Sequence, residues 1–340
     1  MIAATDPAPV ESPGRPTAEQ SLTVAAAPGE ETGALGHLTE FVTWAASVRG
    51  VHPPSRFEAV RCVVFAADDP DEPESAAPAA RRLLRGEGPF ALLAERSGAG
   101  LRLVDVGLAG DELPGASRRA PAVSEPLEPT TLADVLAAVG FGRTVADEEV
   151  DSGADLLVPG VLSAGSTVAA ATVVAALTDT EPVWALGFDA HTPDAVWMRR
   201  CAAVRDRLRE ARPQLGAPYG LLAAAGGVDL AALVGFLLQA AVRRTPALLD
   251  GPAVAAAALV VGELAAEASP WCCAPQTAGT AAERLAYERL GLEPVLSLGV
   301  RLGDGTGALT ALPLLTAAVA LAAATSPEAR DAPERPVPTA

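Results

Sequence analysis

Apolar residues along the chain form two kinds of segment, namely short compact runs and longer stretches at helical spacing. The compact runs are rich in Val, Leu and Phe and are bounded by Gly, Pro or acidic residues, which predicts buried strands. Five runs fit this description: 62–66, 101–106, 154–161, 182–188 and 245–251.

Most of the longer stretches predict helices of ten to eighteen residues between the strands. The one that follows Thr130 and Thr131 opens on a Thr cap, and we expect it to break near Gly140 to Gly142 and to resume as a solvated acidic face. The other predicted helices lie near 35–45, 75–85, 168–179, 195–212, 228–244, 252–268 and 309–324. Strands that alternate with helices predict an α/β fold, with a Rossmann-like, mostly parallel sheet covered by helices on both faces.

Composition narrows this picture. Half of the residues are apolar but only 4% are aromatic, so small side chains must pack the helices closely against the sheet.

Two stretches, 221–242 and 309–324, are apolar enough to suggest a membrane. The first contains Asp229 and the second is short and interrupted by Pro313, so both are interpreted as buried helices.

The formal charge of −17 argues against a nucleic-acid partner, because phosphate backbones bind basic surfaces. Every basic residue is Arg, so a bound phosphate would contact guanidinium or backbone N–H groups. The four cysteines show no metal-ligand spacing with the three histidines, and neither a metal nor a cofactor is expected. No signal peptide is recognised at the N-terminus, which predicts a cytoplasmic protein with reduced thiols.

One candidate site is the stretch "RLGDGTGA", 301–308, where an apolar run leads into a helix. Its glycines let the backbone approach a ligand, and the helix start presents free N–H groups. Asp304 has two interpretations: it satisfies those N–H groups, or it takes a proton from a bound substrate.

A second candidate is the strand-to-helix turn 160–167, whose small residues could hold a phosphate or could merely cap the helix. Arg200 beside Arg199 is ordinarily a solvated pair, and His191 is ordinarily a loop residue without a role in chemistry. The acidic segment 68–74 resembles a cation site in composition but lacks defined spacing, so a flexible loop is expected.

Taken in order, several segments resemble the nicotinate-nucleotide–dimethylbenzimidazole phosphoribosyltransferases of cobalamin lower-ligand assembly. The segments are "VADEEVDSGADLL", "GSTVAAATVVAALTD", "GGVDLAALVGFLLQAAVRRTPALLDG" and "ERLGLEPVLSLGVRLGDGTGALTALPLL", and the likeness extends over 33–324. It implies transfer of phosphoribose from nicotinate mononucleotide to dimethylbenzimidazole or a related aromatic azole. Asp304 matches the glutamate that serves as general base in that family, and its side chain is one methylene shorter. The resemblance also implies substrate-binding positions at Gly165, Ser166, Thr167, Arg200, Leu302, Gly303, Gly305, Thr306 and Gly307.

The chain departs from the family pattern at polar positions. The D-H-G motif is Asp68, Asp69 and Pro70, and the motif with an acid and an Asn reads "GVLSAGSTV" at 160–168. The motif H-R-S-x-E-P-G-H reads "QTAGTAAE" from Gln276, and the phosphate-site lysine is Arg200. Two hypotheses therefore stand side by side: a divergent transferase, and a non-catalytic paralogue that binds a ligand or pairs with an active subunit.

The resemblance also implies a homodimer and a small helical domain built from both ends of the chain. The expected division is a disordered tail (1–20), the first part of the small domain (21–60), a large α/β domain (61–275), the end of that domain with a C-terminal helix (276–325), and a second tail (326–340).

Overall fold

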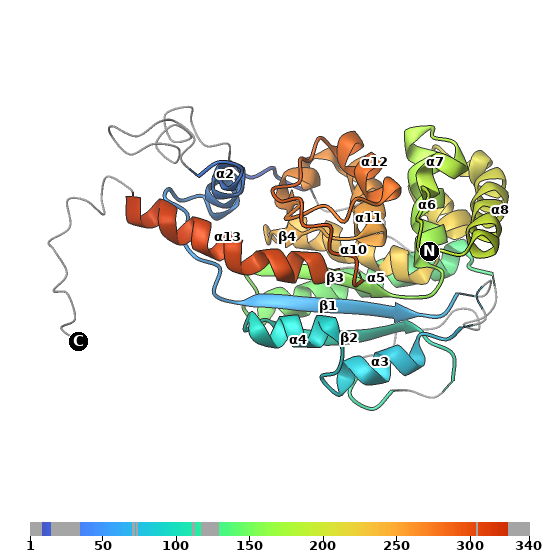
Figure 1. Ribbon diagram of the computed structural model, residues 1–340, viewed down its shortest axis with the longest axis horizontal. Coiled ribbons are helices and arrows are strands. Elements are labelled where there is room, and N and C mark those ends of the chain that lie inside the picture. Colours follow the sequence, from blue (N-terminus) through green and yellow to red (C-terminus); the bar gives the residue numbers. More distant parts are fainter. Residues whose placement is uncertain are drawn as a thin grey trace, which may run out of the picture.

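The fold is built on one parallel sheet of five strands. A computed structural model describes residues 9–14, 35–69, 72, 74–110, 113–116, 129–303 and 305–325. The strands are β1 (Val60–Ala67), β2 (Gly100–Gly107), β3 (Leu156–Leu162), β4 (Ala247–Leu248) and β5 (Cys272–Cys273). Every pair of neighbours is parallel, in the order β2-β1-β3-β4-β5. Figure 1 shows β1 between β2 and β3. The predicted α/β class is confirmed, and four of the five predicted strands are present.

The strand order places a crevice beside the first strand. From β1 the chain crosses to β2 on one side and then returns to β3 on the other. Where the connections of two neighbouring parallel strands leave in opposite directions, a crevice opens beyond their carboxyl ends. The residues that follow β1 and β3 therefore lie where a ligand would be expected.

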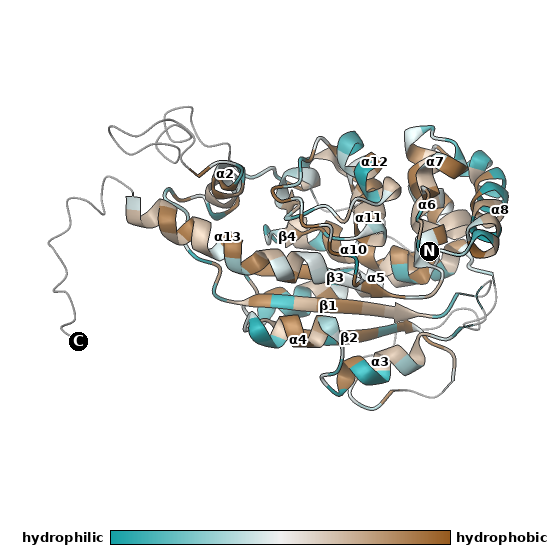
Figure 2. Cartoon of the chain, in the orientation of Figure 1, coloured by the Kyte–Doolittle hydropathy of each residue, from teal (hydrophilic) through white to brown (hydrophobic). Residues whose placement is uncertain are grey.

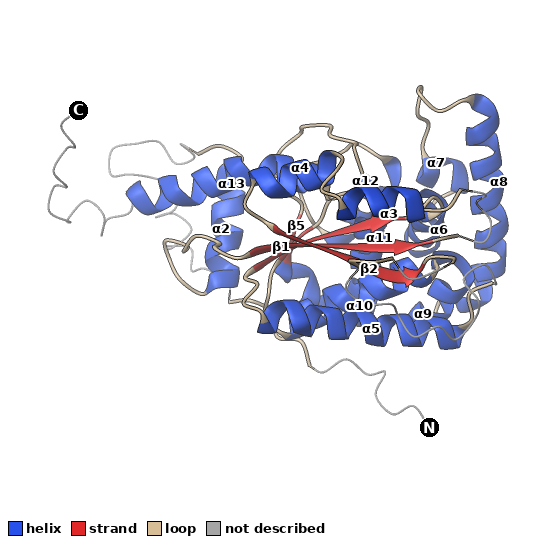
Figure 3. Cartoon of the chain, turned by 90° about the horizontal axis from the view of Figure 1, so that it is seen from below, coloured by secondary structure: helices blue, strands red, loops and turns tan. Residues whose placement is uncertain are grey.

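Helices cover both faces of the sheet (Figure 3). One face packs on α5 (Leu132–Asp151), α10 (Val228–Val242) and α11 (Pro252–Leu264), and it receives Val63 and Phe65 of β1. The other face packs on α3 (Ala77–Leu84), α4 (Pro89–Arg96) and α13 (Thr306–Thr325), and it receives Cys62 and Val64. Alternate residues of β1 thus enter opposite layers, as the pleat of a strand requires.

Helices α5 and α10 cross at very short distance, and glycine makes this possible. A Cβ added at Gly142 would lie 1.9 Å from the carbonyl oxygen of Ala232, and one added at Gly235 would lie 2.0 Å from that of Val139. The predicted break near Gly140 to Gly142 is therefore wrong: α5 runs unbroken from a capping box at Thr131. Glycine serves close packing here and does not end the helix.

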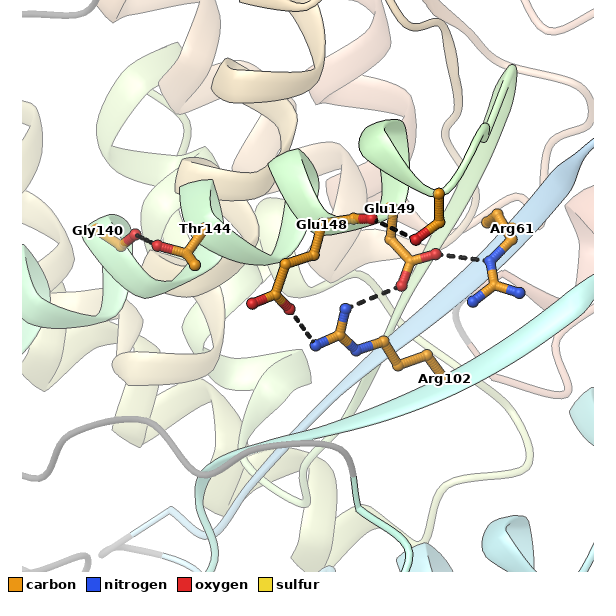
Figure 4. Close-up of polar contacts among 7 residues, drawn as sticks. Arg61, Arg102, Gly140, Thr144, Glu148 and Glu149 are labelled. Atoms are coloured by element: carbon orange, nitrogen blue, oxygen red, sulfur yellow. Dashed lines mark hydrogen bonds and ion pairs between the residues drawn. The ribbon is translucent and has the colours of Figure 1, made fainter.

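The last turns of α5 carry a partly buried ion-pair cluster that ties the helix to the sheet (Figure 4). Glu149 accepts from Nε of Arg61 at 2.6 Å and from Arg102 at 3.0 Å, and Glu148 pairs with Arg102 at 2.6 Å. Glu149 is 2% exposed, so the prediction of a solvated acidic face is wrong at this residue. Arg61 is the second residue of β1, which places this cluster away from the carboxyl ends of the strands.

The remaining helices pack around this framework. They are α2 (Leu38–Arg49), α6 (Ser166–Thr178), α7 (Pro182–Leu186), α8 (Asp194–Ala211), α9 (Pro218–Leu221) and α12 (Ala281–Leu290), with short helical turns at Arg212–Gln214, Leu222–Gly226 and Ala266–Trp271. The segment 182–188 was predicted as a strand, and the structure corrects this to the short helix α7. It begins with Pro182, which suits the first turn of a helix, and it contacts α6, α8 and α12 at the edge of the fold.

Helix α13 is long and apolar enough to cross a membrane by length and composition, and it is the only such helix in the described residues. Figure 2 shows that most of this helix is coloured toward the hydrophobic end of the scale. Half of its most apolar window is buried within the protein. Ala318 and Ala322 pack on Val42 of α2, and Leu309 and Leu312 lie in the core beside α4. These contacts are those of a core helix, although much of its opposite side is exposed.

A short segment near the N-terminus, residues 9–14, lies against the body of the protein. The indole nitrogen of Trp271 donates to the carbonyl oxygen of Glu11 at 2.8 Å, and the hydroxyl of Ser47 donates to the carbonyl oxygen of Gly14 at 2.7 Å. This segment falls within the predicted tail 1–20. The other predicted tail, 326–340, lies outside the described residues.

Candidate active site

A cavity of about 610 Å³ opens beyond the carboxyl ends of β3 and β4. Its walls come from the turn after β3, the start of α6, the segment 186–192 between α7 and α8, the first part of α8, the loop after β4, and the segments 278–284 and 300–303. Sequence segments more than 130 residues apart therefore meet at the edge where parallel strands place their binding residues.

The turn between β3 and α6 forms one wall of the cavity. Ser163, Ser166 and Thr167 line it, and the hydroxyl of Ser166 donates to the carbonyl oxygen of Ser163 at 3.0 Å. Gly165 does not line the cavity but allows the turn to pass Asp69, since an added Cβ would lie 1.9 Å from Oδ2 of that carboxylate. Helix α6 starts at this wall, where backbone N–H groups suit an anion.

Two polar atoms in the cavity walls are buried without a hydrogen-bond partner among the described residues. They are Nε of Arg200 on α8 and the hydroxyl of Thr280 just before α12. Buried donors normally have a partner, because leaving one unpaired costs free energy. A guanidinium and a hydroxyl that face the same cavity are suited to a phosphate or a sugar oxygen.

The glycine loop reaches the cavity at Gly303, whose φ of +120° few other residues adopt. Gly305 has φ +86° and donates its N–H to the backbone oxygen of Asp250 at 3.1 Å. Thr306 is 1% exposed and donates its hydroxyl to the carbonyl oxygen of Gly303 at 2.5 Å. Asp304, the predicted base, lies outside the described residues.

Asp250 holds the glycine loop in place, and sequence reasoning missed it. Its Oδ2 accepts the N–H of Gly307 at 2.7 Å, and its Oδ1 accepts the side-chain amide of Gln276 at 2.5 Å. Burial raises the pKa of Asp250 to about 6, and the nearby charge of Glu283 contributes to the rise, while the donated hydrogen bonds oppose the shift. The only sequence signal was its place in "LLDG", directly after a short strand.

The two ends of "QTAGTAAE" are buried framework residues. Gln276 and Glu283 are both 0% exposed. Glu283 accepts from the N–H of Gly251 at 3.0 Å and from that of Ala278 at 2.9 Å. These are the positions where the family pattern has histidine. In this chain an amide and a carboxylate there hold the loops that form the cavity wall.

The acidic residues after β1 are engaged with the protein itself. Asp68 accepts the N–H of Ala76 at 2.6 Å and that of Ala109 at 2.9 Å, and Asp69 pairs with Arg207 of α8 at 2.8 Å. The expectation of a flexible loop is therefore wrong at these two positions; 70, 71 and 73 lie outside the described residues. Within the described part of the chain, no three His, Cys, Asp or Glu side chains gather to hold a metal ion.

The sequence-predicted positions divide into two sets. Ser166, Thr167, Arg200 and Gly303 line the cavity together. Leu302 is 64% exposed outside it. Gly305 and Gly307 do not line it but are hydrogen-bonded to Asp250, and Thr306 between them is buried. A Cβ at Gly307 would meet Asp250 and Gln276 within 2.4 Å, so this glycine serves close packing. His191 has an exposed side chain that pairs with the neighbouring Asp189.

The sequence matches a family model described as "Phosphoribosyltransferase" over residues 10–330. It is 46% identical over 301 residues to the nicotinate-nucleotide–dimethylbenzimidazole phosphoribosyltransferase of Mycobacterium tuberculosis (strain ATCC 25618 / H37Rv), covering 85% of this chain and 83% of that protein. The protein of the same name from Mycobacterium avium (strain 104) is 45% identical over 301 residues, covering 85% and 86%.

Solved structures agree with the sequence matches. The crystal structure of CobT from Thermus thermophilus superposes with a TM-score of 0.81 at 29% identity, covering 90% of this chain and 95% of that one. The family model spans most of the chain and the relatives exceed 40% identity, so the fold and the sequence give the same assignment. The chain belongs to the nicotinate-nucleotide–dimethylbenzimidazole phosphoribosyltransferase family.

Proposed function

We propose that this chain transfers phosphoribose from nicotinate mononucleotide to dimethylbenzimidazole or a related azole, and so contributes to cobalamin assembly. The observation that carries the proposal is the cavity in which the start of α6, the unpaired Nε of Arg200 and the glycine loop at Gly303 meet. An anion site beside an open space of about 610 Å³ suits a nucleotide together with a small aromatic ring.

The reaction balances without a cofactor. The lone pair of one azole nitrogen attacks C1′ of the ribose and forms the new C–N bond, while the bond from C1′ to the pyridinium nitrogen breaks. The bonding electrons neutralise the pyridinium, so nicotinate leaves without needing a proton. The azole, cationic after attack, gives up the proton on its second nitrogen to a base.

The family resemblance assigns the role of base to Asp304. Its neighbours support this proposal, because Gly303 lines the cavity and Gly305 is fixed to Asp250. The shorter side chain of Asp, compared with the family's Glu, reduces the reach of the carboxylate by about one methylene, which is large beside the tolerance of a hydrogen bond. Slow turnover with dimethylbenzimidazole is the expected consequence.

The phosphate of the nucleotide is assigned to the wall formed by α6 and α8. Ser166 and Thr167 stand at the start of α6, and Arg200 of α8 lines the same cavity. A guanidinium binds a phosphate through two parallel hydrogen bonds, and a helix start adds backbone donors. Arg301, whose Nε is held by the carbonyl oxygen of Ala278 at 2.6 Å, adds a second positive charge.

A second hypothesis, a non-catalytic subunit that binds a ligand or an active paralogue, is favoured by the residues at three positions of the family pattern. Apolar Val161 lines the cavity where the family pattern has an acid, and Gln276 and Glu283, at the histidine positions, serve the framework. Such a chain would bind a nucleotide or a benzimidazole without converting either.

Product analysis separates the two hypotheses. The purified chain is incubated with nicotinate mononucleotide and dimethylbenzimidazole, and the mixture is analysed by chromatography and mass spectrometry for the ribosylated azole phosphate. A transferase forms this product and an equal amount of nicotinate. Heat-stability shifts with each ligand but no product, over a panel of azoles, would favour the binding subunit.

The remaining expectations are part of this proposal. We expect a homodimer, and light scattering that gives the mass of a single chain would contradict it. The division into a large α/β domain and a small helical domain made from both ends of the chain also stands as a proposal, as does a cytoplasmic location. The packing of α2 on α13 supports the small domain.

A further inference from the structure

Two aromatic rings form one wall of the cavity described above. Phe188 follows α7 and Trp197 lies in the first turns of α8, and both line the cavity. Their centroids are 5.8 Å apart and their planes meet at 76°, an edge-to-face pair. The indole nitrogen of Trp197 donates to the carbonyl oxygen of Gly187 at 2.7 Å, which fixes the orientation of the ring.

The same face of α8 carries a cation next to this wall. Arg200 is three residues after Trp197, so the two side chains are neighbours on one side of the helix, and both line the cavity. Phe188 remains 70% exposed, although aromatic side chains of this size are usually buried. A half-open aromatic wall and a guanidinium in the same cavity are the chemical groups that suit a flat ring attached to a phosphate.

We propose that Phe188 and Trp197 bind the pyridine ring of the nucleotide and thereby determine which base the cavity accepts. The proposal rests on the proposed function, since nicotinate mononucleotide is the donor there. The ring of this nucleotide is a pyridinium cation, and aromatic faces attract cations. Once the bond to the ribose breaks, the ring nitrogen is neutral, so the attraction that holds the substrate ring is lost in the product and nicotinate is released.

The test compares two ligands that share the phosphate and differ in the ring. Titration calorimetry measures the Kd of nicotinate mononucleotide and of ribose 5-phosphate for the wild-type chain and for Trp197→Ala, Phe188→Ala and Arg200→Gln. We expect Trp197→Ala and Phe188→Ala to weaken the nucleotide about tenfold and ribose 5-phosphate less than about twofold. Arg200→Gln should weaken both ligands.

Control variants separate ring binding from folding. Trp184→Ala removes a tryptophan that is 70% exposed on α7 and does not line the cavity, so neither Kd should change. Trp197→Phe keeps an aromatic ring and should retain most of the affinity for the nucleotide. If Trp197→Ala does not fold, as judged by circular dichroism, Phe188→Ala alone carries the test, because its exposed ring is not needed for the core.

Two results would overturn the inference. One is wild-type affinity for the nucleotide in the folded aromatic variants, and the other is an equal loss of affinity for both ligands. If either occurs while the wild-type chain still releases nicotinate, the proposed function stands and only the role of the aromatic wall is lost. If nicotinate mononucleotide does not bind to the wild-type chain at all, both the proposed function and the role of the aromatic wall are contradicted.

Discussion

Gly307 donates its backbone N–H to Oδ2 of Asp250 at 2.7 Å, and this bond joins the loop after β4 to the start of α13. Gly305, two residues earlier, donates to the backbone oxygen of the same aspartate at 3.1 Å. Asp250 therefore holds the chain immediately after the proposed base. Because both of its carboxylate oxygens accept hydrogen bonds within the protein, we regard Asp250 as a positioning residue and not as a proton acceptor for the substrate.

The variant Asp250→Asn tests this positioning role. Its amide turns a donor toward either the N–H of Gly307 or the side-chain amide of Gln276, and rotation of the Gln276 amide would break its two bonds to the backbone of Val300. We therefore expect a loss of about 1–3 kcal/mol in the free energy of unfolding, together with reduced kcat. The double variant Asp250→Asn with Gln276→Glu restores a donor opposite an acceptor. It should recover much of the lost free energy of unfolding and much of the lost kcat. Urea denaturation and nicotinate release measure the two effects. A double variant no better than the single one would argue that the charge at 250 itself is required.

Close packing at Gly307 gives a second prediction. A Cβ at this position would lie 2.2 Å from the side-chain amide nitrogen of Gln276, so Gly307→Ala should lower the free energy of unfolding by about 1–3 kcal/mol. Gly140→Ala is the matched control: Gly140 is exposed on α5 with no atom within 4 Å of an added Cβ, and alanine there should stabilise by about 0.5–1 kcal/mol. Thermal unfolding should show a lower Tm for Gly307→Ala and a higher Tm for Gly140→Ala than for the wild type. A tolerated alanine at 307 would contradict the described loop.

The pH dependence of stability should report on Asp229. Burial raises the pKa of this carboxyl from 3.8 to about 6, and the charge of Asp69 adds to the rise, while the N–H of Leu230 opposes it. Between about pH 4 and pH 6 the folded state therefore holds a proton that the unfolded state releases, so the stability contributed by this group falls as pH rises through that range.

The comparison with Asp229→Asn isolates this effect, because the amide does not titrate. The difference in the free energy of unfolding, wild type minus variant, should decrease between about pH 4 and pH 7 in denaturant titrations. Asp206→Asn is the control, because the hydrogen bond from Arg205 lowers the pKa of the exposed Asp206 carboxyl. For this variant the difference in the free energy of unfolding, wild type minus variant, should not decrease over the same pH range. A flat difference for Asp229→Asn would mean that this carboxyl titrates normally in the folded protein.

Arg200 gives a prediction about substrate binding. Loss of a hydrogen bond from a charged donor to a phosphate costs about 1.5–3 kcal/mol, so Arg200→Gln should raise the KM for nicotinate mononucleotide about tenfold to a hundredfold. Arg200→Lys keeps the positive charge but not the planar guanidinium, so its KM should lie between those of the wild type and Arg200→Gln. The neighbour Arg199 is exposed and does not line the cavity, so Arg199→Gln should match the wild type in steady-state kinetics. Equal effects at both positions would indicate a general electrostatic influence.

The sequence predicted the elements whose pattern is local. The strands β1, β2 and β3 are compact apolar runs, and α5 begins at a Thr cap, so each could be recognised within its own segment. Segment 182–188 has strand-like composition, yet it is helical because its contacts are with α6 and α8 and not with a neighbouring strand. Strand β5, only Cys272 and Cys273, is too short to give any pattern.

The site was harder to predict, because its geometry depends on residues far apart in sequence. The glycine loop could be found by its motif, but its support comes from Asp250 and Gln276, which lie 57 and 31 residues before Gly307 and carry no distinctive motif. The run 294–300 before the glycine loop is apolar, yet only Val295 of it is buried, and Leu298 is 41% exposed. Local apolarity does not reveal which side of a loop faces the protein.

The most direct test of the central claim, that the glycine loop carries a base for phosphoribosyl transfer, is the rate of nicotinate release from nicotinate mononucleotide in the presence of dimethylbenzimidazole. We predict azole-dependent release by the wild-type chain, loss of most of it in Asp304→Asn, and release at least equal to wild type in Asp304→Glu, which restores the family's residue. Release that is unchanged in Asp304→Asn, or absent from the wild-type chain although both substrates bind, would contradict it.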